Sequence, residues 1–399
     1  MGFSDLPRMR SGPAATRAAT GRIAGTITID SYTRVGDEAA AERAVRDGVP
    51  LHGYPITARG AHTTESVLHG IRDDTSPVQV RHGWAQPQRI LAALVPAGRD
   101  ATESGPVSYC LPYRRMPLRE SAANWGEAVE FPAGMRDAGL DPHLETFGGC
   151  MLGQLCPLGQ LVAISAGEAL FSHRLGLRSI SLSYAQQTNV DQDEQAVGAL
   201  HRLAAELSPD TDRHVVLYTY LGLFPRTAPG ALRPLAHSAQ LAVRTGGARL
   251  IVKSVAEAHR IATITENVEA LETAAAAAAS TPRPDGRAGA AGNEVDAEAR
   301  EPVDAVLDLH DDVGSALLLA FERGYLDATG RPRWADVGPI PLGHAVEDGL
   351  APQRRSADLL EALSFVRRRD DDAPLDGDEL VPIGRSDARG LSGTPWRSE

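Results

Sequence analysis

The chain has 399 residues, of which 42% are apolar, and its 40 basic and 52 acidic side chains give a formal charge of -12. A chain of this length can bury a large core, and it suits one barrel-sized domain with additions or two smaller domains. The acidic balance argues against nucleic acid or an anionic membrane as the main partner, so a soluble enzyme is the default expectation. The N-terminus lacks the apolar run of a signal peptide, and no segment approaches the roughly 18 apolar residues of a transmembrane helix, which predicts a cytoplasmic protein.

The three cysteines, Cys110, Cys150 and Cys156, are odd in number and show no paired metal-type spacing. In a chain that need not be secreted, we expect them to be reduced, buried thiols. No pair of His or Cys residues at ligand spacing completes a zinc or iron-sulfur site, so the sequence predicts no metal site built from this chain's own side chains.

Short apolar, β-branched segments alternate with helical segments along the first two thirds of the chain. Strands are expected, in chain order, at residues 22–30, 49–56, 78–80, 107–111, 143–147, 179–184, 214–220 and 249–252. Helices are expected at residues 38–47, 63–72, 87–95, 118–139, 159–175, 191–207, 229–245 and 262–273. Eight strands that alternate with helices predict a (β/α)8 TIM barrel over residues 1–273, with its active site at the carboxyl ends of the strands.

The composition changes after residue 273. A polyalanine run and a stretch rich in Pro, Gly, Ala and Arg predict a flexible linker over residues 274–295, although the alanines could instead extend the preceding helix. Residues 296–366 show helical periodicity with Gly-Pro turns, which predicts a C-terminal helical accessory region. A run of arginines and aspartates opens residues 367–399, which we expect to be disordered.

The segment 103–113, Glu-Ser-Gly-Pro-Val-Ser-Tyr-Cys-Leu-Pro-Tyr, is the strongest candidate for the wall of an active site. One carboxylate, Glu103, and two phenols, Tyr109 and Tyr113, can point into a single cavity from such a segment. A segment of this kind, taken alone, is more often an ordinary strand with half-buried tyrosines.

Three cationic residues, Arg34, Arg81 and Lys253, each follow an apolar strand. A (β/α)8 barrel puts its active-site residues at those positions. Each arginine taken singly is more often part of a surface ion pair, so it is the joint pattern that favours a functional site.

Segment 103–113 resembles the corresponding stretch of the large (epsilon) subunit of glutamate mutase, also called methylaspartate mutase. Other segments match that family in the same order: Thr-Ile-Asp-Ser-Tyr-Thr-Arg34, Arg81-His82-Gly83, Glu145-Thr-Phe-Gly148, Gly222-Leu-Phe-Pro225 and Ile251-Val-Lys-Ser-Val-Ala-Glu257. The spacing from Arg81 to Glu103 to Tyr109 also matches, and the resemblance is collinear over roughly residues 1–370.

The resemblance implies the catalytic subunit of an adenosylcobalamin-dependent enzyme that interconverts L-glutamate and threo-3-methyl-L-aspartate by a radical mechanism. It also implies a separate small (sigma) subunit that carries most of the cobalamin, and a dimer of this chain within a heterotetramer. The protein would then have to neutralise a dicarboxylic amino acid, enclose it away from water and hold the adenosyl group.

Roles at the substrate are implied residue by residue. The implied substrate contacts are Arg34, Arg81, His82, Glu103, Tyr109 and Tyr113. Guanidinium groups bind carboxylates through two parallel hydrogen bonds, so Arg34 and Arg81 would clamp the substrate carboxylates. Glu103 would meet the substrate ammonium and is the expected catalytic residue.

Roles at the cofactor are implied in the same way. Lys253 and Glu257 match residues that hold the ribose of the adenosyl group, and they would lie one helical turn apart. Further implied contacts are Gly2, Pro112, Phe224 and Ile261. His52 stands where the family has an asparagine, which leaves the transfer of that contact open.

The N-terminus departs from the family pattern. Counting back from Arg34, the family's Pro-Arg pair, whose arginine is another substrate clamp, falls immediately before Met1, together with the first strand of the family's barrel. We expect either a start codon upstream of Met1 or a barrel that lacks its first strand, and the loss of a central strand would expose two sheet edges.

Two other functions stay open. One is a non-catalytic remnant that keeps the barrel and the partner surface. The other is a lyase that uses Lys253 as a Schiff-base nucleophile at the end of a barrel strand.

Overall fold

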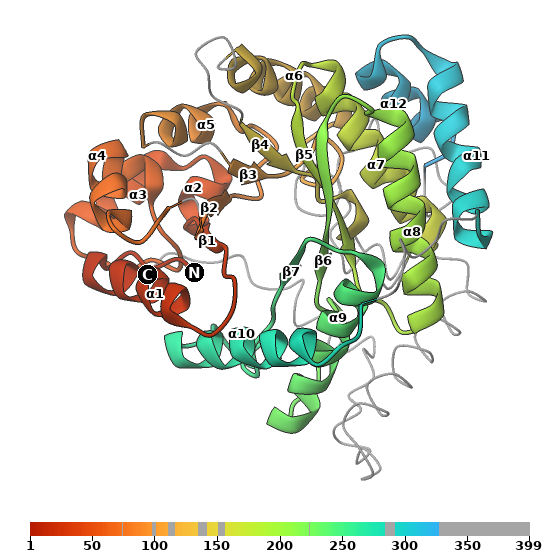
Figure 1. Ribbon diagram of the computed structural model, residues 1–399. Helices are drawn as coiled ribbons and strands as arrows, with labels where there is room; N and C mark the ends of the chain where they lie inside the picture. The colour runs from red at the N-terminus through yellow and green to blue at the C-terminus, as the bar shows by residue number, and fades with distance from the viewer. Residues whose placement is uncertain are drawn as a thin grey trace, which may run out of the picture.

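The computed structural model describes residues 1–73, 75–97, 101–110, 116–134, 142–150, 156–222, 224–283 and 292–326 (Figure 1). Two residues with implied roles, Pro112 and Tyr113, lie outside these ranges. The expected disordered tail at 367–399, residues 327–366 of the accessory region and residues 284–291 of the expected linker lie outside them as well.

Seven parallel strands form one curved sheet in which the order along the chain is also the order in space (Figure 1). They are β1 (Gly25–Thr28), β2 (Val78–Arg81), β3 (Ala101–Glu103), β4 (His143–Glu145), β5 (Ser179–Ala185), β6 (Asp212–Tyr218) and β7 (Arg249–Ile251). Parallel neighbours require crossover connections, and helices supply them. The result is an α/β fold that resembles a TIM barrel.

Helices surround the outer face of this sheet (Figure 1). They are α1 (Leu6–Ala18), α2 (Ser31–Val35), α3 (Glu38–Arg46), α4 (Ile56–Leu68), α5 (Gln88–Leu94), α6 (Leu118–Gly134), α7 (Leu158–Arg174), α8 (Val190–Leu207), α9 (Ala228–Thr245), α10 (Ile264–Ala279), α11 (Glu294–Leu309) and α12 (Val313–Glu322). Side-chain caps fix where several of these helices begin. The Asn189 side chain accepts hydrogen bonds from the first backbone amides of α8, and Thr263 and Glu266 form a reciprocal capping box at the start of α10.

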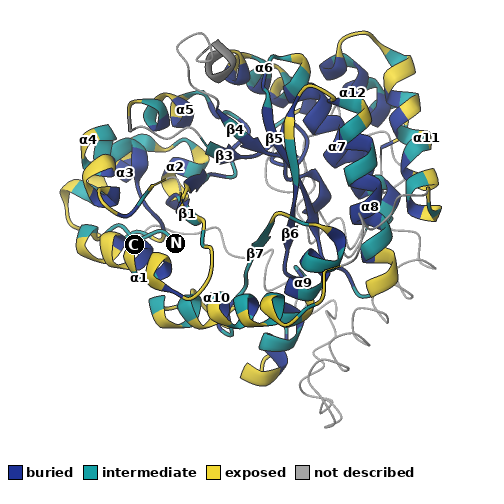
Figure 2. Cartoon of the chain, in the orientation of Figure 1, coloured by how far each residue is buried: buried dark blue, intermediate teal, exposed yellow. Residues whose placement is uncertain are grey.

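The main core lies between the sheet and helices α7 and α8, where Figure 2 shows the buried residues gathered. Helix α7 is buried on nearly every side, because α11 and α12 cover its outer face. A helix that is apolar all round needs such a cover. The part of the accessory region that the structure describes is therefore packed on the sheet domain.

The structure corrects the expected closed, eight-stranded barrel. Residues 49–56 do not form a strand, since Gly53 takes a φ of +115° and only isolated bridges involve His52 and Tyr54. Of the strand expected at 107–111, residues 107–110 form a turn and residue 111 lies outside the described ranges, and the strand of this region is Ala101–Glu103. The other six predicted strands overlap β1, β2, β4, β5, β6 and β7.

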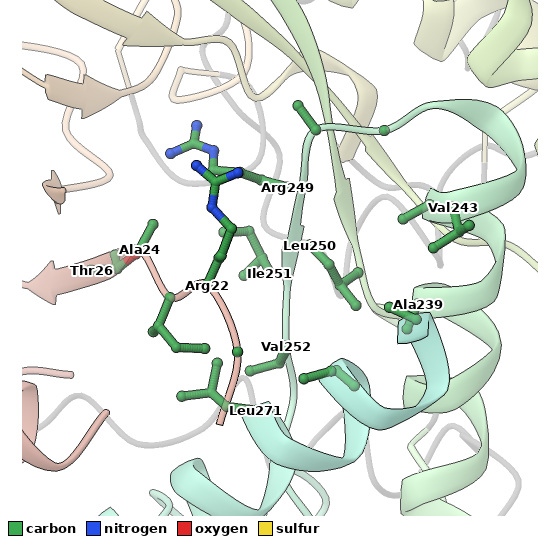
Figure 3. A pocket seen from close by; sticks show the side chains of 18 residues that line it. Arg22, Ala24, Thr26, Ala239, Val243, Arg249, Leu250, Ile251, Val252 and Leu271 are labelled. Atoms are coloured by element: carbon green, nitrogen blue, oxygen red, sulfur yellow. The ribbon is translucent and has the colours of Figure 1, made fainter. Parts of the chain in front are cut away.

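Strands β1 and β7 form the two edges of the sheet. Both edges, with α9 and α10, line a cavity of about 360 Å³. Figure 3 shows Leu250, Val252 and Leu271 among the side chains that line it. Met1 lies beside β1: its ammonium donates to the Thr26 carbonyl, and the Thr28 amide donates to the Met1 carbonyl at 3.0 Å. This is the hydrogen-bond pattern of a parallel ladder.

The polyalanine run belongs to helix α10, which continues to Ala279. The alanines therefore extend the preceding helix, the alternative that composition had left open. Cys110 and Cys150 are buried thiols, whereas Cys156 is partly exposed. Among the described helices, none has the length and apolar character needed to cross a membrane.

Candidate functional site

Side chains from the carboxyl ends of several strands meet in one buried cluster. Arg81, Glu103 and Glu145 stand side by side in the register of β2, β3 and β4, at the last residue of each strand. Tyr218, the last residue of β6, reaches the same point. Parallel strands bring their carboxyl ends to one edge, so this cluster forms where a barrel fold places its active site.

Arg81 and Glu103 form the central ion pair of the cluster. The Arg81 Nε atom lies 2.6 Å from Glu103 Oε1, and Glu103 is only 1% exposed. Arg81 Nη2 donates to the Tyr218 hydroxyl at 2.8 Å. The hydroxyl of Tyr109 donates to Glu103 Oε1, so the carboxylate is held by a guanidinium and a phenol at once.

Glu145 and Arg249 form a second ion pair behind the first. Arg249 Nη2 lies 2.5 Å from Glu145 Oε2, and Glu145 is fully buried. Burial raises the pKa of Glu145, and the charge of Glu103 acts in the same direction, whereas Arg249 opposes the shift. Two carboxylates thus lie close together in a site of low dielectric constant.

The ring of His82 lines the same cluster. It stacks on Trp125, with ring centroids 5.7 Å apart, and lies edge-on to Tyr109. Its Nδ1 atom accepts from the backbone amide of Trp84 at 3.1 Å. Burial, and next the charge of Arg34, lowers the pKa of His82 to about 3.

The ring of His82 is therefore neutral, and its proton is on Nε2, because Nδ1 is the acceptor. The Nε2 atom is buried and has no hydrogen-bond partner within the part of the chain that the structure describes. A buried donor without an acceptor is costly, and a bound carboxylate or carbonyl would satisfy it. Arg34, on the short helix α2, lies against Gly83, next to His82 in the chain.

Glu168, on helix α7, holds the turn that carries Tyr109. Its Oε1 atom accepts hydrogen bonds from the backbone amides of Val107 at 3.0 Å and Ser108 at 2.7 Å. The Ser121 hydroxyl donates to the Pro106 carbonyl at 2.7 Å and fixes the start of the same turn. The position of Tyr109 thus depends on a residue more than 50 positions further along the chain.

Lys253 and Glu257 form an ion pair just beyond the end of β7. Their side chains are 20% and 40% exposed, so the pair faces solvent. Ile261, four residues further on, is exposed, and Phe224, beyond the end of β6, is half-buried.

Gly2 and His52 meet beyond the end of β1. A Cβ on Gly2 would lie 1.9 Å from the Thr28 carbonyl oxygen and 3.0 Å from the Cα of Gly53, so a side chain does not fit there. His52 is exposed, and it forms an isolated bridge with Phe3. Of the described residues with implied cofactor contacts, Lys253 follows the carboxyl end of β7, and Gly2 packs against Thr28 at the carboxyl end of β1.

Four residues of the cluster had no role in the analysis of the sequence: Glu145, Glu168, Tyr218 and Arg249. Glu145 and Tyr218 are the last residues of β4 and β6, but they lie inside the strands expected at 143–147 and 214–220, so the strand-end signal that singled out Arg81 is not visible for them. Glu168 and Arg249 show no such signal, because their partners are distant in sequence. No group of three or more His, Cys, Asp or Glu side chains suited to a metal ion occurs among the described residues.

Comparison with known proteins identifies the family of this chain. A family model described as methylaspartate mutase E chain matches residues 7–342. The chain is 30% identical over 349 residues to the glutamate mutase epsilon subunit of Halobacterium salinarum, an alignment that covers 85% of this chain and 70% of that protein. It is 27% identical over 343 residues to the epsilon subunit of Haloarcula marismortui, covering 83% and 69% of the two chains. It is 27% identical over 334 residues to the one from Escherichia coli O157:H7, covering 78% and 68%. This chain belongs to the methylaspartate mutase E chain family, and so to the isomerases of the mutase type.

Proposed function

We propose that this chain is the catalytic subunit of an adenosylcobalamin-dependent mutase that interconverts L-glutamate and threo-3-methyl-L-aspartate. The buried ion pair between Arg81 and Glu103, with the Tyr109 hydroxyl on the same carboxylate, carries the proposal. A dicarboxylic amino acid bears two carboxylates and one ammonium. A site that offers a guanidinium and a carboxylate side by side is complementary to both kinds of charge.

Substrate binding would exchange one set of ion pairs for another. Without a ligand, Arg81 and Glu103 neutralise each other. A zwitterionic substrate can take both places, with its ammonium on Glu103 and a carboxylate on Arg81, so no buried charge is left without a partner. His82 Nε2 and the guanidinium of Arg34 would complete the carboxylate contacts.

The residues implied at the cofactor have the chemistry that an adenosyl group needs. Lys253 supplies a cationic donor and Glu257 a carboxylate acceptor, a pair suited to the two hydroxyls of a ribose. Gly2 packs its backbone against Thr28 and Gly53, where no side chain fits, and this packing fixes the position of the N-terminal segment. Adenosylcobalamin, when bound, supplies the radical chemistry, and this chain binds and orients the substrate and excludes water.

We further propose that a separate small (sigma) subunit carries most of the cobalamin, and that this chain forms a dimer within a heterotetramer. The relatives in the comparison are named as epsilon subunits, which supports a multi-subunit enzyme. The isolated chain is then expected to bind cobalamin weakly, and a binding titration with and without the small subunit would test it.

A lyase that uses Lys253 as a Schiff-base nucleophile is less well supported. Such a lysine must lose its proton, and the ion pair with Glu257 stabilises the charged ammonium instead. Borohydride trapping of a carbonyl compound on Lys253 would favour the lyase.

The direct test is conversion of ¹³C-labelled L-glutamate, followed by NMR, with a matching small subunit and adenosylcobalamin. We expect 3-methylaspartate to appear, and Glu103→Gln to slow its appearance at least about 100-fold, since a catalytic charge is removed. Glu65→Gln, at an exposed position, is the matched control and should react as the unmodified chain does. No product, with binding of the small subunit retained, would favour the non-catalytic alternative.

A further inference from the structure

The hydroxyl of Tyr218 lies between two buried carboxylates. It is 2.8 Å from Glu103 Oε2, and it is also hydrogen-bonded to Glu145 Oε1. Arg81 Nη2 donates to the same hydroxyl oxygen at 2.8 Å. A phenol has one proton to donate, and two carboxylate oxygens compete for it here.

The count of protons does not balance when both carboxylates are ionised. If Tyr218 donates to Glu103, the Oε1 atom of Glu145 faces a phenol oxygen that has no proton left. If Tyr218 donates to Glu145, the Oε2 atom of Glu103 faces the same conflict. One additional proton on Glu145 Oε1 resolves both cases, because Glu145 then donates to Tyr218 and Tyr218 donates to Glu103.

The remaining partners favour Glu145 over Glu103 as the site of this proton. Glu103 is held by two further donors, the Arg81 guanidinium and the Tyr109 hydroxyl, which both stabilise its ionised form. Glu145 is fully buried, and its Oε2 atom already accepts from Arg249, as the carbonyl oxygen of a protonated acid also can.

The titratable and polar groups that face Glu145 come from several strands, while its register partner on β5, Ser181, carries only a hydroxyl. They are Arg249 from β7, Arg81 and Gln79 from β2, Glu103 from β3, Tyr218 from β6 and the thiol of Cys150 beyond β4. Burial and Glu103 raise the pKa of Glu145, while Arg249, Tyr218 and Arg81 lower it, and the net direction is upward. The direction agrees with the count of protons.

We propose that Glu145 is a protonated carboxylic acid in this protein and acts through Tyr218 as a positioning residue that keeps Glu103 ionised for the substrate ammonium. The link to the ammonium rests on the proposed function. With Glu145 neutral, the guanidiniums of Arg34, Arg81 and Arg249 outnumber the one carboxylate of Glu103, so the site is positively charged. A substrate with two carboxylates and one ammonium has one net negative charge, which is complementary to that site, and an ionised Glu145 would weaken the attraction.

Infrared difference spectroscopy of the full chain tests the protonation without substrate or cofactor. We expect the C=O band of a protonated carboxylic acid at pH 7 to be present in the unmodified chain and lost in Glu145→Gln. Glu168→Gln, at a buried carboxylate outside the Tyr218 hydrogen bonds, is the matched control and should keep this band. Tyr218→Phe should keep the band but shift it, because the acid loses its acceptor. A spectrum in which Glu145→Gln and Tyr218→Phe change nothing in this band would overturn the proposal.

The pH dependence of substrate affinity tests the positioning role in the assembled complex. In the unmodified protein, the dissociation constant for L-glutamate should rise by up to about tenfold per pH unit above the pH at which Glu145 loses its proton. The glutamine of Glu145→Gln cannot ionise, so this variant should lose the rise of the dissociation constant at alkaline pH. Any rise that remains in the variant reports deprotonation of the substrate ammonium. Tyr218→Phe should weaken binding about tenfold or more, since the donor to Glu103 is gone.

The two measurements separate the two proposals. If the infrared band is lost in Glu145→Gln but the unmodified protein does not bind L-glutamate, Glu145 is protonated and the proposed substrate is wrong. If the dissociation constant for L-glutamate rises equally at alkaline pH in the unmodified chain and in Glu145→Gln, the positioning role is wrong, even if the mutase is active.

Discussion

A Cβ added to Gly105 would stand 2.1 Å from Oε1 of Glu168, so the backbone of the active-site turn lies directly against this carboxylate. The same oxygen accepts from the amides of Val107 and Ser108, and Tyr109 follows them. Helix α7 therefore determines where the Tyr109 hydroxyl meets Glu103.

Removal of the Glu168 carboxylate should both destabilise the protein and slow the reaction. Glu168→Ala leaves two buried amides without an acceptor, which we expect to lower the free energy of unfolding by about 2–4 kcal/mol. Glu168→Gln keeps an acceptor oxygen and should lose less. Urea unfolding measures the difference, and Glu65→Ala, at an exposed position, should stay within about 0.5 kcal/mol of the unmodified chain. Equal stability of Glu168→Ala and Glu65→Ala would show that the turn does not depend on Glu168.

Arg81→Lys should lower kcat/KM for L-glutamate by about 100-fold or more. A lysine keeps the charge but cannot hold Glu103, Tyr218 and a substrate carboxylate with one planar group. Steady-state kinetics with the small subunit and adenosylcobalamin measure the loss. Arg89→Lys is the matched control, because Arg89 pairs with Glu38 and its side chain is 70% exposed. A similar modest effect of both changes would argue against a carboxylate clamp at Arg81.

Lys253→Met and Glu257→Gln should raise the dissociation constant for adenosylcobalamin in the assembled complex by about 10- to 100-fold each, the range of a lost charge-assisted hydrogen bond. Stability should change little, because an exposed ion pair contributes about 0–1 kcal/mol. A coenzyme titration with each variant measures the effect. Arg260→Gln breaks the neighbouring ion pair with Glu266 and serves as the control. Weakening by Arg260→Gln as large as that by Lys253→Met would remove the assigned role.

The neutral ring of His82 should make the fold sensitive to acid. Its pKa is lowered to about 3 in the folded chain, below the usual value of 6.5 in the unfolded chain. Between these values the unfolded chain binds more protons, so the free energy of unfolding falls as the pH drops from 6.5 toward 3 and is fully retained above 6.5. Burial lowers the pKa of His214 to about 4, which adds to the effect.

Urea unfolding at several pH values measures this slope. His82→Gln should flatten the slope below pH 6.5, although its stability at pH 7 also falls, because a buried ring is replaced. His69→Gln, at an exposed position, should leave the slope as it is in the unmodified chain. Identical slopes in the three proteins would contradict a neutral, buried His82.

Periodicity predicted most of the sheet but failed at two segments for different reasons. Residues 49–56 contain apolar residues at strand-like spacing, but Gly53 takes a positive φ and the chain turns there. Strand β3 has only three residues, too few for an alternation to be visible, so periodicity places the strand in the apolar residues that follow β3. The predicted strand therefore begins beyond the end of β3.

The sequence by itself determined the alternation of strands and helices, and it singled out Arg81, Glu103 and Tyr109 as candidate site residues, because local pattern and spacing carry this information. Only the tertiary structure decided that Glu145, Tyr218 and Arg249 join them, and that Glu168 holds the turn. These contacts join residues far apart in the chain, through strand register and the curvature of the sheet. Spacing along a chain does not encode them, since the order of the strands in space sets which side chains share a buried site.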